Sequence, residues 1–561
     1  MNCKARIAGT LTAAAWLLAA SSCARAAVIH VPGDQPTIAA GLAAAAAGDT
    51  LLLACGTYFE HGMTIAMPLT IASETGDPGC AAIDAEFNGR IFWIDGADDV
   101  VFSGITLAKG RSDWGSAVYA DTAGVSFISC AFEASQAGME GGAVFCNAGS
   151  GAFTDCDFAG NDAEIAGGGI VLSSAGGTFT NCRFVDNEAW WGGGVCAYHE
   201  GATPVFSGCE FRQNRAVSPP GNEPYGGGAY CWDHAAPTFS YCDFIENTSG
   251  HGGAGIMSDQ ECLIVVDHCT FQGNSAVVGA GLETWWTRGG SVTNCEFTGN
   301  TATEWGGGVL YEQSQDVVFS DCAFTNNEAG IGGGAFDLTA ATPGPTGCTF
   351  TGNTAQFGGG VGLSDAVGVT LADCTFVGNS AFAGGAVAAD SCASPAVVGC
   401  TISGNTAQYG GALAFTGSST PSVSGSTLVL NGATVGGAGM AAWTGTTVSV
   451  AQTIIAFGTV GGAVLTDGCP VSCSTTAIYG NVGGDWVGPV AGQEGLDHNI
   501  ATDPLLCAVM SGDHTLCEDS PCLPGNNGAG LLIGRFGQGC DGPCGAPVEA
   551  RSWGSIKAMY R

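Results

Sequence analysis

One short motif, Cys-x-Phe-x-x-Asn, recurs at nearly constant spacing through most of this 561-residue chain. Consecutive copies begin 26 or 27 residues apart, except that 33 residues separate Cys209 from Cys242. A period of this length is typical of a solenoid, in which each repeat packs on its two neighbours. Full copies begin at Cys156, Cys182, Cys209, Cys242, Cys269, Cys295, Cys322, Cys348 and Cys374, and degenerate copies at Cys130, Cys400, Ser426 and Thr453.

Each repeat contains three short segments with the alternation of a β-strand. The cysteine and the aromatic residue two positions later share one face. An apolar residue three positions before the cysteine has the opposite parity and therefore belongs to a separate strand. The glycine-rich stretch after the asparagine starts a third strand. Three strands and three turns per repeat predict an all-β fold, a right-handed parallel β-helix.

The asparagine of the motif is expected to form a turn. Asparagine tolerates the left-handed backbone conformation, and its side-chain amide can bond to the asparagine of the next coil. The column of asparagines is therefore interpreted as a structural ladder, not as a set of ligands.

The composition excludes some classes of partner. The formal net charge is −36, and only 14 lysines and arginines are present. A protein with so few cations has little means of neutralising phosphates, so no nucleic-acid partner is expected. Anionic membranes and uronic-acid polymers would be repelled for the same reason, unless a divalent cation bridges them.

The first residues resemble an export signal. Lys4 and Arg6 precede an apolar run, and Ala24-Arg25-Ala26 offers a cleavage site. The alternative is lipid attachment at Cys23. No later apolar run of about twenty residues predicts a membrane span. The protein is therefore expected to be secreted or held at the cell surface.

The repeat pattern divides the chain into five parts. We expect a signal peptide over residues 1–26, an N-terminal cap and irregular entry coils over 27–124, and regular repeats over 125–465. Cysteine-rich closing coils are expected over 466–548 and a C-terminal tail over 549–561. The cap is predicted to contain a short helix, since a helix would cover the open end of a strand stack.

Two groups stand out among the 27 cysteines. Eleven occupy one repeat position, from Cys130 to Cys400, and are expected to be buried free thiols. The remaining candidates for disulfides are Cys55 with Cys80, Cys469 with Cys473, and the group Cys507, Cys517, Cys522, Cys540 and Cys544.

Two stretches carry a resemblance to known families. The segments Leu51–Ala54 and Gly56–Glu60 resemble the opening coil of the pectate-lyase-like β-helix superfamily. Phe-x-x-Asn followed by Gly-Gly-Ala-(Ile/Leu/Val), as at Gly141–Val144 and Gly410–Leu413, resembles the repeats of polymorphic outer-membrane proteins. The second resemblance implies adhesion at a bacterial surface, although the terminal membrane-embedded barrel typical of that family is not expected in this chain.

Function is expected where the repeat varies, on an outward column of side chains. The position four residues after the last small residue of the glycine motif combines aromatic and acidic groups, which suit sugar rings and their hydroxyls. By this count the column also includes Leu338. The only long insertion, residues 216–224, is expected to form a lip beside it. The candidate ligand-binding residues are Trp191, Tyr198, Trp232, Asp259, Trp285 and Glu312.

Other interpretations of these residues remain open. The aromatic residues could simply stack on one another. Asp259 and Glu312, two coils apart, fall near the carboxylate spacing of a glycosidase, and Arg288 is the only nearby base for a lyase. His199 and His234 lack a third ligand, so no metal site and no cofactor are expected.

The leading hypothesis is a non-catalytic module that binds an extracellular polysaccharide or a cell-surface ligand. A polysaccharide hydrolase or lyase acting in a groove on the outer face is the alternative. The convergence of Asp259, Glu261, Glu283 and Glu312 in one groove would favour the enzyme.

Overall fold

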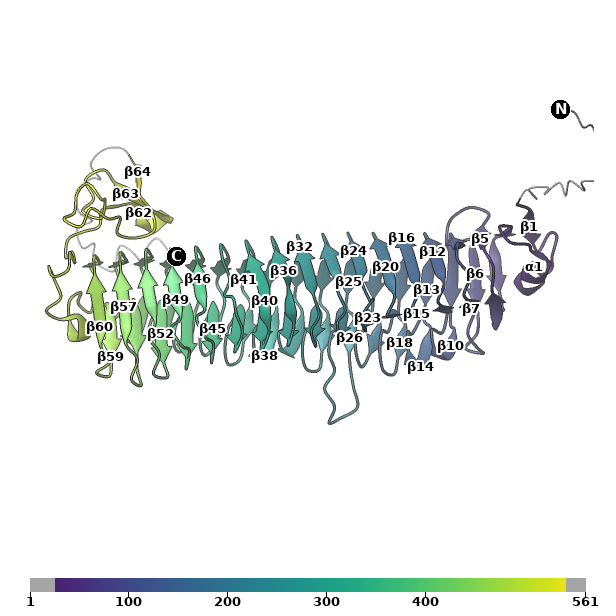
Figure 1. The fold of residues 1–561 in the computed structure, drawn as a ribbon, viewed down its shortest axis with the longest axis horizontal. Helices are drawn as coiled ribbons and strands as arrows, with labels where there is room; N and C mark the ends of the chain where they lie inside the picture. Colours follow the sequence, from purple (N-terminus) through teal and green to yellow (C-terminus); the bar gives the residue numbers. More distant parts are fainter. Residues whose placement is uncertain (1–25, 541–561) are drawn as a thin grey trace, which may run out of the picture.

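The computed structural model describes residues 26–540, and these form a long rod of stacked coils (Figure 1). The predicted export signal lies outside the described residues except for its last residue. Cys23, Cys544 and the C-terminal tail lie outside them entirely. Within the rod each strand pairs in parallel with the equivalent strand of the next coil. The predicted parallel β-helix is confirmed.

One coil shows the plan of all the regular repeats. It contains β12 (Gly124–Ile128), β13 (Ala131–Glu133), β14 (Gln136–Glu140) and β15 (Val144–Asn147). These belong to four parallel ladders, which we name sheets A, B, D and C in that order. The three predicted strands are present as sheets A, B and C. Sheet D, a short ladder directly after the asparagine, was not predicted.

Sheet C carries the outer face discussed below. Its sixteen strands are β4 (Met63–Ile65), β7 (Phe92–Asp95), β11 (Val118–Asp121), β15, β19 (Ile170–Ser173), β23 (Val195–Tyr198), β27 (Ala229–Trp232), β31 (Ile256–Asp259), β35 (Leu282–Trp285), β39 (Val309–Glu312), β43 (Phe336–Thr339), β45 (Val361–Ser364), β48 (Val387–Asp390), β52 (Leu413–Thr416), β56 (Met440–Ala442) and β59 (Val464–Thr466).

Columns of stacked phenylalanines fill the core. The motif phenylalanines of sheet B lie face to face in successive coils, with centroids 4.5 Å apart for Phe132 and Phe158 and 4.7 Å apart for Phe350 and Phe376. This separation is close to the spacing of hydrogen-bonded strands. Each ring is therefore buried by the equivalent ring of the next coil, which ties core packing to coil register.

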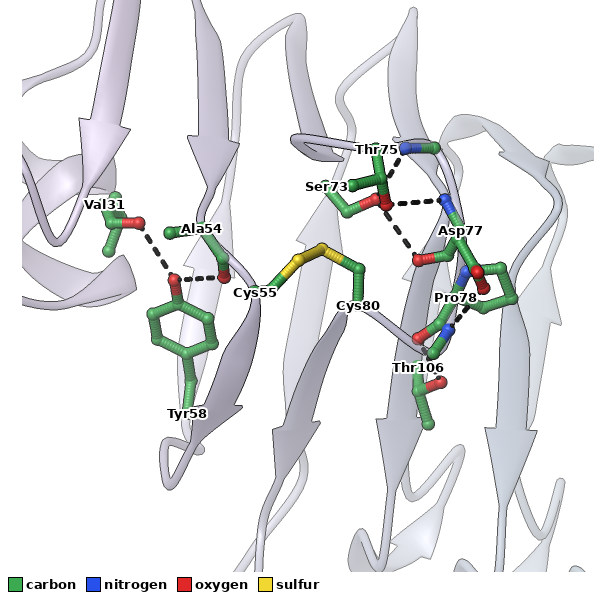
Figure 2. The surroundings of a disulfide bond; sticks show 12 residues. Val31, Ala54, Cys55, Tyr58, Ser73, Thr75, Asp77, Pro78, Cys80 and Thr106 are labelled. Carbon is green, nitrogen blue, oxygen red and sulfur yellow. Dashed lines mark hydrogen bonds between the residues drawn. A yellow bond between two sulfur atoms is a disulfide. The ribbon is translucent and has the colours of Figure 1, made fainter.

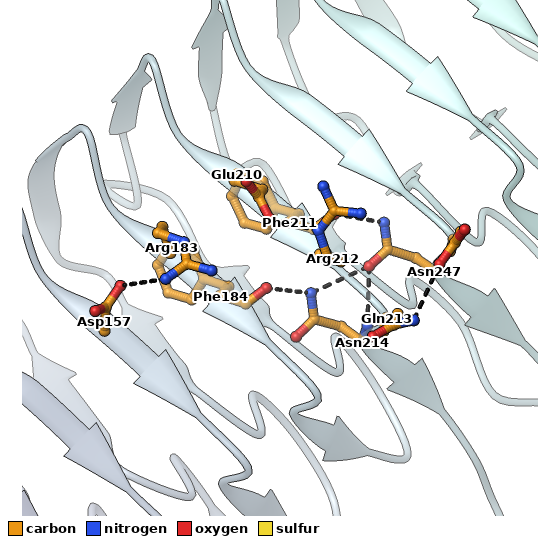
Figure 3. Close-up of polar contacts among 10 residues, drawn as sticks. Asp157, Arg183, Phe184, Glu210, Phe211, Arg212, Gln213, Asn214 and Asn247 are labelled. Atoms are coloured by element: carbon orange, nitrogen blue, oxygen red, sulfur yellow. Dashed lines mark hydrogen bonds and ion pairs between the residues drawn. The ribbon is translucent and has the colours of Figure 1, made fainter.

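A ladder of buried asparagines closes the turn between sheets B and D. Asn214 donates from Nδ2 to the carbonyl oxygen of Phe184 in the preceding coil and to Oδ1 of Asn247 in the following one (Figure 3). Its backbone N–H also donates to Asn247 Oδ1, at 3.0 Å. The predicted amide-to-amide ladder is confirmed, and it satisfies backbone groups that the turn would otherwise leave unpaired.

The left-handed residue of this turn is not the asparagine. Positive φ angles occur one position earlier, as at Gly299 (63°) before Asn300 and Asp186 (53°) before Asn187. The expected conformation was wrong because the asparagine must point its amide into the core. The preceding residue reverses the chain instead.

The cysteines follow the prediction in part. The eleven column cysteines are buried free thiols, and Cys55 and Cys80 form a disulfide beside the first coils (Figure 2). Cys469 and Cys473 are free, contrary to the prediction. Four residues apart along extended chain, their Cα atoms are separated by roughly 13 Å, well beyond disulfide reach.

Both ends of the stack are covered. Helix α1 (Ile38–Ala44) begins at the N-cap Thr37 and buries Ile38 over the first coil, which confirms the predicted cap. At the other end Val490 of the 3-10 helix η1 (Gly488–Val490) packs against the core. Trp486, just before this helix, packs there as well.

Residues 506–540 do not continue as coils. They form a small sheet of β62 (Leu506–Ala508), β63 (Asp513–Cys517) and β64 (Gln538–Cys540), held by the Cys507–Cys540 disulfide. This lobe folds back over the outside of the rod (Figure 1). There the Arg535 guanidinium donates to the carbonyl oxygens of Asp373 and Cys374. Among residues 26–540, no helix is long and apolar enough to span a membrane.

Replacing one rung of the asparagine ladder is expected to destabilise the rod. Asn300→Ala removes the donor to Phe271 and the acceptor for the Asn274 backbone N–H, leaving buried polar groups unpaired. A loss of about 3 kcal/mol in the free energy of unfolding is expected, measured by chemical denaturation. Asn326→Gly, at an exposed left-handed position, should change it little. Equal effects of the two substitutions would contradict this role.

Candidate functional site

The outer face of sheet C is bordered on one side by a ledge. In each strand the second and fourth residues face outward. The ledge is the last residue of the corner that leads from sheet D, and it pairs from coil to coil through single β-bridges. In the C-terminal half the ledge residues are Val278, Trp305, Gly332, Phe357, Ala383 and Tyr409.

The predicted binding column lies on this face. Tyr198 and Trp232 pair in register, as do Asp259 with Trp285 and Trp285 with Glu312. Trp191 instead occupies the ledge, between Ala166 and Tyr225. The next member of the column is Thr339, not Leu338, which is buried in the core. The miscount arose because the glycine motif of that coil is one residue longer.

The aromatic residues of this column cover one another. Trp232 lies 5.6 Å from Tyr198, 6.3 Å from Tyr230 and 6.4 Å from Trp191, measured between ring centroids. Large second-position residues, Tyr230 and Met257, occupy the space beneath them. Tyr198 and Tyr230 are therefore buried, and this section of the face is a packed aromatic layer.

The predicted lip lies beside this layer. The insertion after β26 (Arg215–Ala216) projects from the rod as a long loop (Figure 1). Its end is tied down where Trp190 Nε1 donates to the carbonyl oxygen of Glu223 at 3.1 Å. The hydroxyl of Ser249 donates to the carbonyl oxygen of Pro224 at 2.8 Å.

Two acids are buried within the same layer. Asp259 accepts a hydrogen bond from the Tyr230 hydroxyl at 3.2 Å, and burial raises its pKa to about 6. Glu283 lies against Gly252, and burial, with Glu312 and Asp259 nearby, raises its pKa well above the usual value. Among the described residues, Asp259 Oδ1 and Glu283 Oε2 have no hydrogen-bond partner.

Glu261 does not join these acids. It is exposed at the corner between sheets C and A, where its carboxylate lies 2.9 Å from Arg288 Nη1 and 3.3 Å from His234 Nε2. His199 and His234 both hydrogen-bond the carboxylate of Asp233. The charged residues of this corner therefore form a network of ion pairs that is exposed to solvent.

Sequence analysis missed an open groove farther along sheet C. From β45 onward the second-position residues become small, Gly362, Ala388 and Ala414, and a cavity of about 730 Å³ opens above them. Its floor also includes Asp390 on β48. An aromatic wall runs along the ledge and beyond, formed by Trp305, Phe357, Phe382, Tyr409 and Trp443.

From Phe357 to Trp443 the aromatic wall is continuous and accessible. Phe382 lies 6.3 Å from Phe357 and 5.5 Å from Tyr409, and Tyr409 lies 5.4 Å from Trp443, between ring centroids. Phe357 and Phe382 remain 42% and 45% exposed. Neighbouring rings are tilted by 65° to 81°. Unlike the layer around Trp232, this wall presents apolar surface to solvent beside a floor that leaves room for a ligand.

Asp337 forms the buried end of the groove. Its side chain is 1% exposed, and its Oδ1 accepts a hydrogen bond from the Thr339 hydroxyl at 3.0 Å. Its Oδ2 has no partner among the described residues and lies over Gly362, where an added Cβ would approach to 2.4 Å. Burial, with Glu312 nearby, raises the pKa of Asp337 to about 7.

The protonation of Asp337 is expected to make stability depend on pH. Its pKa rises from 3.8 to about 7 on folding, so the folded protein holds this proton more tightly. The free energy of unfolding should therefore fall as pH rises from about 4 to about 7. Asp337→Asn removes this titrating group. The substitution should therefore raise the free energy of unfolding more at pH 8 than at pH 4, by on the order of a few kcal/mol.

Thermal unfolding at the two pH values tests this dependence. Asp321→Asn changes an exposed aspartate at another corner of the same coil, at a position that is asparagine in the coil of Asn294, and serves as the control. The same gain at pH 4 and pH 8 for Asp337→Asn would contradict the assignment.

Comparison with solved structures gives distant matches. Similar solved structures include pectate lyase Pel9A, 13% identical over 56% of this chain and 76% of that chain, and the periplasmic alginate epimerase AlgG, 10% identical over 59% and 80%. The mannuronan C-5 epimerase AlgE4 A-module of Azotobacter vinelandii is 14% identical over 59% and 87%. All three have a TM-score of 0.31, too low to bear on function.

Two further matches concern the sequence. A segment of 138 residues, 24% of this chain, is 30% identical to the metabotropic glutamate receptor-like protein R of Dictyostelium discoideum, and it spans only 8% of that protein. The model of the right-handed beta helix region family matches residues 116–300 and 280–455, together more than half of the chain. The chain therefore belongs to the right-handed β-helix family.

Proposed function

We propose that this protein is an exported or surface-held module that binds a polysaccharide in the groove of sheet C. The observation that carries the proposal is the groove itself, in which an exposed aromatic wall stands beside a floor of small residues. Flat apolar rings stack on sugar rings, and a few polar groups then fix the orientation of the sugar. The groove extends over several coils, as an extended polymer requires.

The proposed site lies farther along the same outward column of sheet C, where Ser364, Asp390 and Thr416 line the groove. The side chains of Trp191, Tyr198 and Trp232 pack against one another. Phe357, Phe382 and Tyr409 have comparable chemistry but border open space. The binding hypothesis therefore stands with different residues.

Substitutions in the groove test this function. Phe357→Ala removes part of the wall, and Ala388→Phe fills the floor, so each should weaken binding of a glycan oligomer about tenfold or more. Val367→Ala is a control, because Val367 is 69% exposed at another corner and does not line the groove. Isothermal titration against a panel of oligosaccharides measures the effect. Binding that survives both groove substitutions would contradict the proposed site.

A second candidate function is a polysaccharide hydrolase. It is favoured by one observation, a buried carboxyl in the groove whose pKa of about 7 keeps it partly protonated at neutral pH. Asp337 would protonate the glycosidic oxygen as general acid, while a second carboxylate activates water. Glu312, on the preceding coil and near enough to raise the pKa of Asp337, is the candidate for the second role. A lyase has less support, since residues 289–534 contain no lysine or arginine as base.

Reducing-end release from neutral and amino-sugar polysaccharides distinguishes the two functions. A hydrolase should release new ends, and Asp337→Asn should reduce the rate by at least about a hundredfold. The Asp321→Asn protein should retain the rate of the unmodified protein. Retention of the polymer without release of new ends would exclude the hydrolase and leave the binding module.

A further inference from the structure

The groove is acidic and lies in a part of the chain without basic side chains. Not one lysine or arginine occurs from residue 289 to residue 534. Asp337, Asp390 and Asp467 all line the groove. An anionic polymer would meet uncompensated carboxylates here and no partner for its own charge, so polyuronates are unsuitable ligands.

The three acidic side chains are spread along the direction of the rod, and Asp337, with a pKa of about 7, is a largely uncharged carboxyl at pH 6. Asp337 lies on β43, and Asp390 lies two coils later on β48. Asp467 follows β59, three coils beyond Asp390. At the usual spacing of strands these steps correspond to about 10 Å and about 14 Å. A linear ligand lying along the groove would therefore meet acidic groups at intervals, beside the aromatic wall.

One of these acids has an unused acceptor. Asp337 is 1% exposed, yet its Oδ2 has no partner among the described residues, and it borders the cavity. A buried carboxyl oxygen without a donor is costly, and a ligand N–H or O–H group would relieve that cost. Asp390, on the open floor, is exposed and available to a charged group.

We propose that the groove binds an amino-sugar polymer whose rings carry protonated amines. This inference rests on the proposed polysaccharide-binding function. Ammonium groups pair with carboxylates and are attracted to aromatic faces, and both kinds of group line this groove. A neutral polymer would use only the aromatic wall and the hydrogen bonds. The amine therefore distinguishes the preferred ligand from other glycans.

Three oligomers of one length and linkage separate the possibilities. The probes are the β-1,4-linked hexamers of glucosamine, N-acetylglucosamine and glucose, titrated at pH 6 in low salt. The glucosamine hexamer should bind about tenfold tighter than the other two, and added salt should reduce this preference. Equal affinity for all three would overturn the amine preference and leave the proposed function standing. Failure of all three hexamers and of a polyuronate to bind would overturn both.

Variants show whether the preference comes from the groove or from the net charge of the protein. Asp390→Asn should weaken binding of the glucosamine hexamer about tenfold and change binding of the glucose hexamer less than about twofold. Asp321→Asn removes the same charge from an exposed corner outside the groove and should leave both affinities unchanged. If Asp321→Asn weakens glucosamine binding as much as Asp390→Asn does, the preference reflects net charge alone and the inference is wrong.

Discussion

Register between coils is the constraint on which the rest of this structure depends. The buried asparagine amides connect each coil to the one before it and the one after it. The stacked phenylalanines require the same alignment. A residue at a given repeat position is therefore held directly above its equivalents, and any chemical property shared by successive coils becomes a line along the rod. Outward-facing side chains do not pack in the core, so their identity is free to vary from coil to coil.

That freedom produces two different surfaces on one sheet. Where the second residue of the strand is large, as at Tyr230 and Met257, the neighbouring aromatic residues pack onto it and form a closed layer. Where it is small, as at Gly362 and Ala388, the ledge stands apart from the floor and a groove remains. Gly362 also leaves room for the carboxyl of Asp337. The size of one column of side chains thus decides whether aromatic residues act as core or as a binding wall.

The repeat predicts the fold well and the site poorly, for a physical reason. Strand alternation and constant spacing identify the three main strands, the thiol column and the asparagine ladder, because each is a local pattern repeated many times. Whether Trp232 or Phe357 is accessible depends on residues in adjacent coils and across the corner, which no single repeat reveals. The row of small residues at the second position of successive sheet C strands was visible in the sequence. It gains meaning only once the ledge beside it is known.

The central claim is that a ligand lies along the floor from Asp337 to Asp467, against the aromatic wall. A crystal structure of the protein with the glucosamine hexamer bound tests it most directly. The account predicts sugar rings stacked on Phe357, Phe382 or Tyr409, with an amine near Asp390. Sugar bound at the layer around Trp232, or at the charged corner beside Glu261 and Arg288, would contradict it.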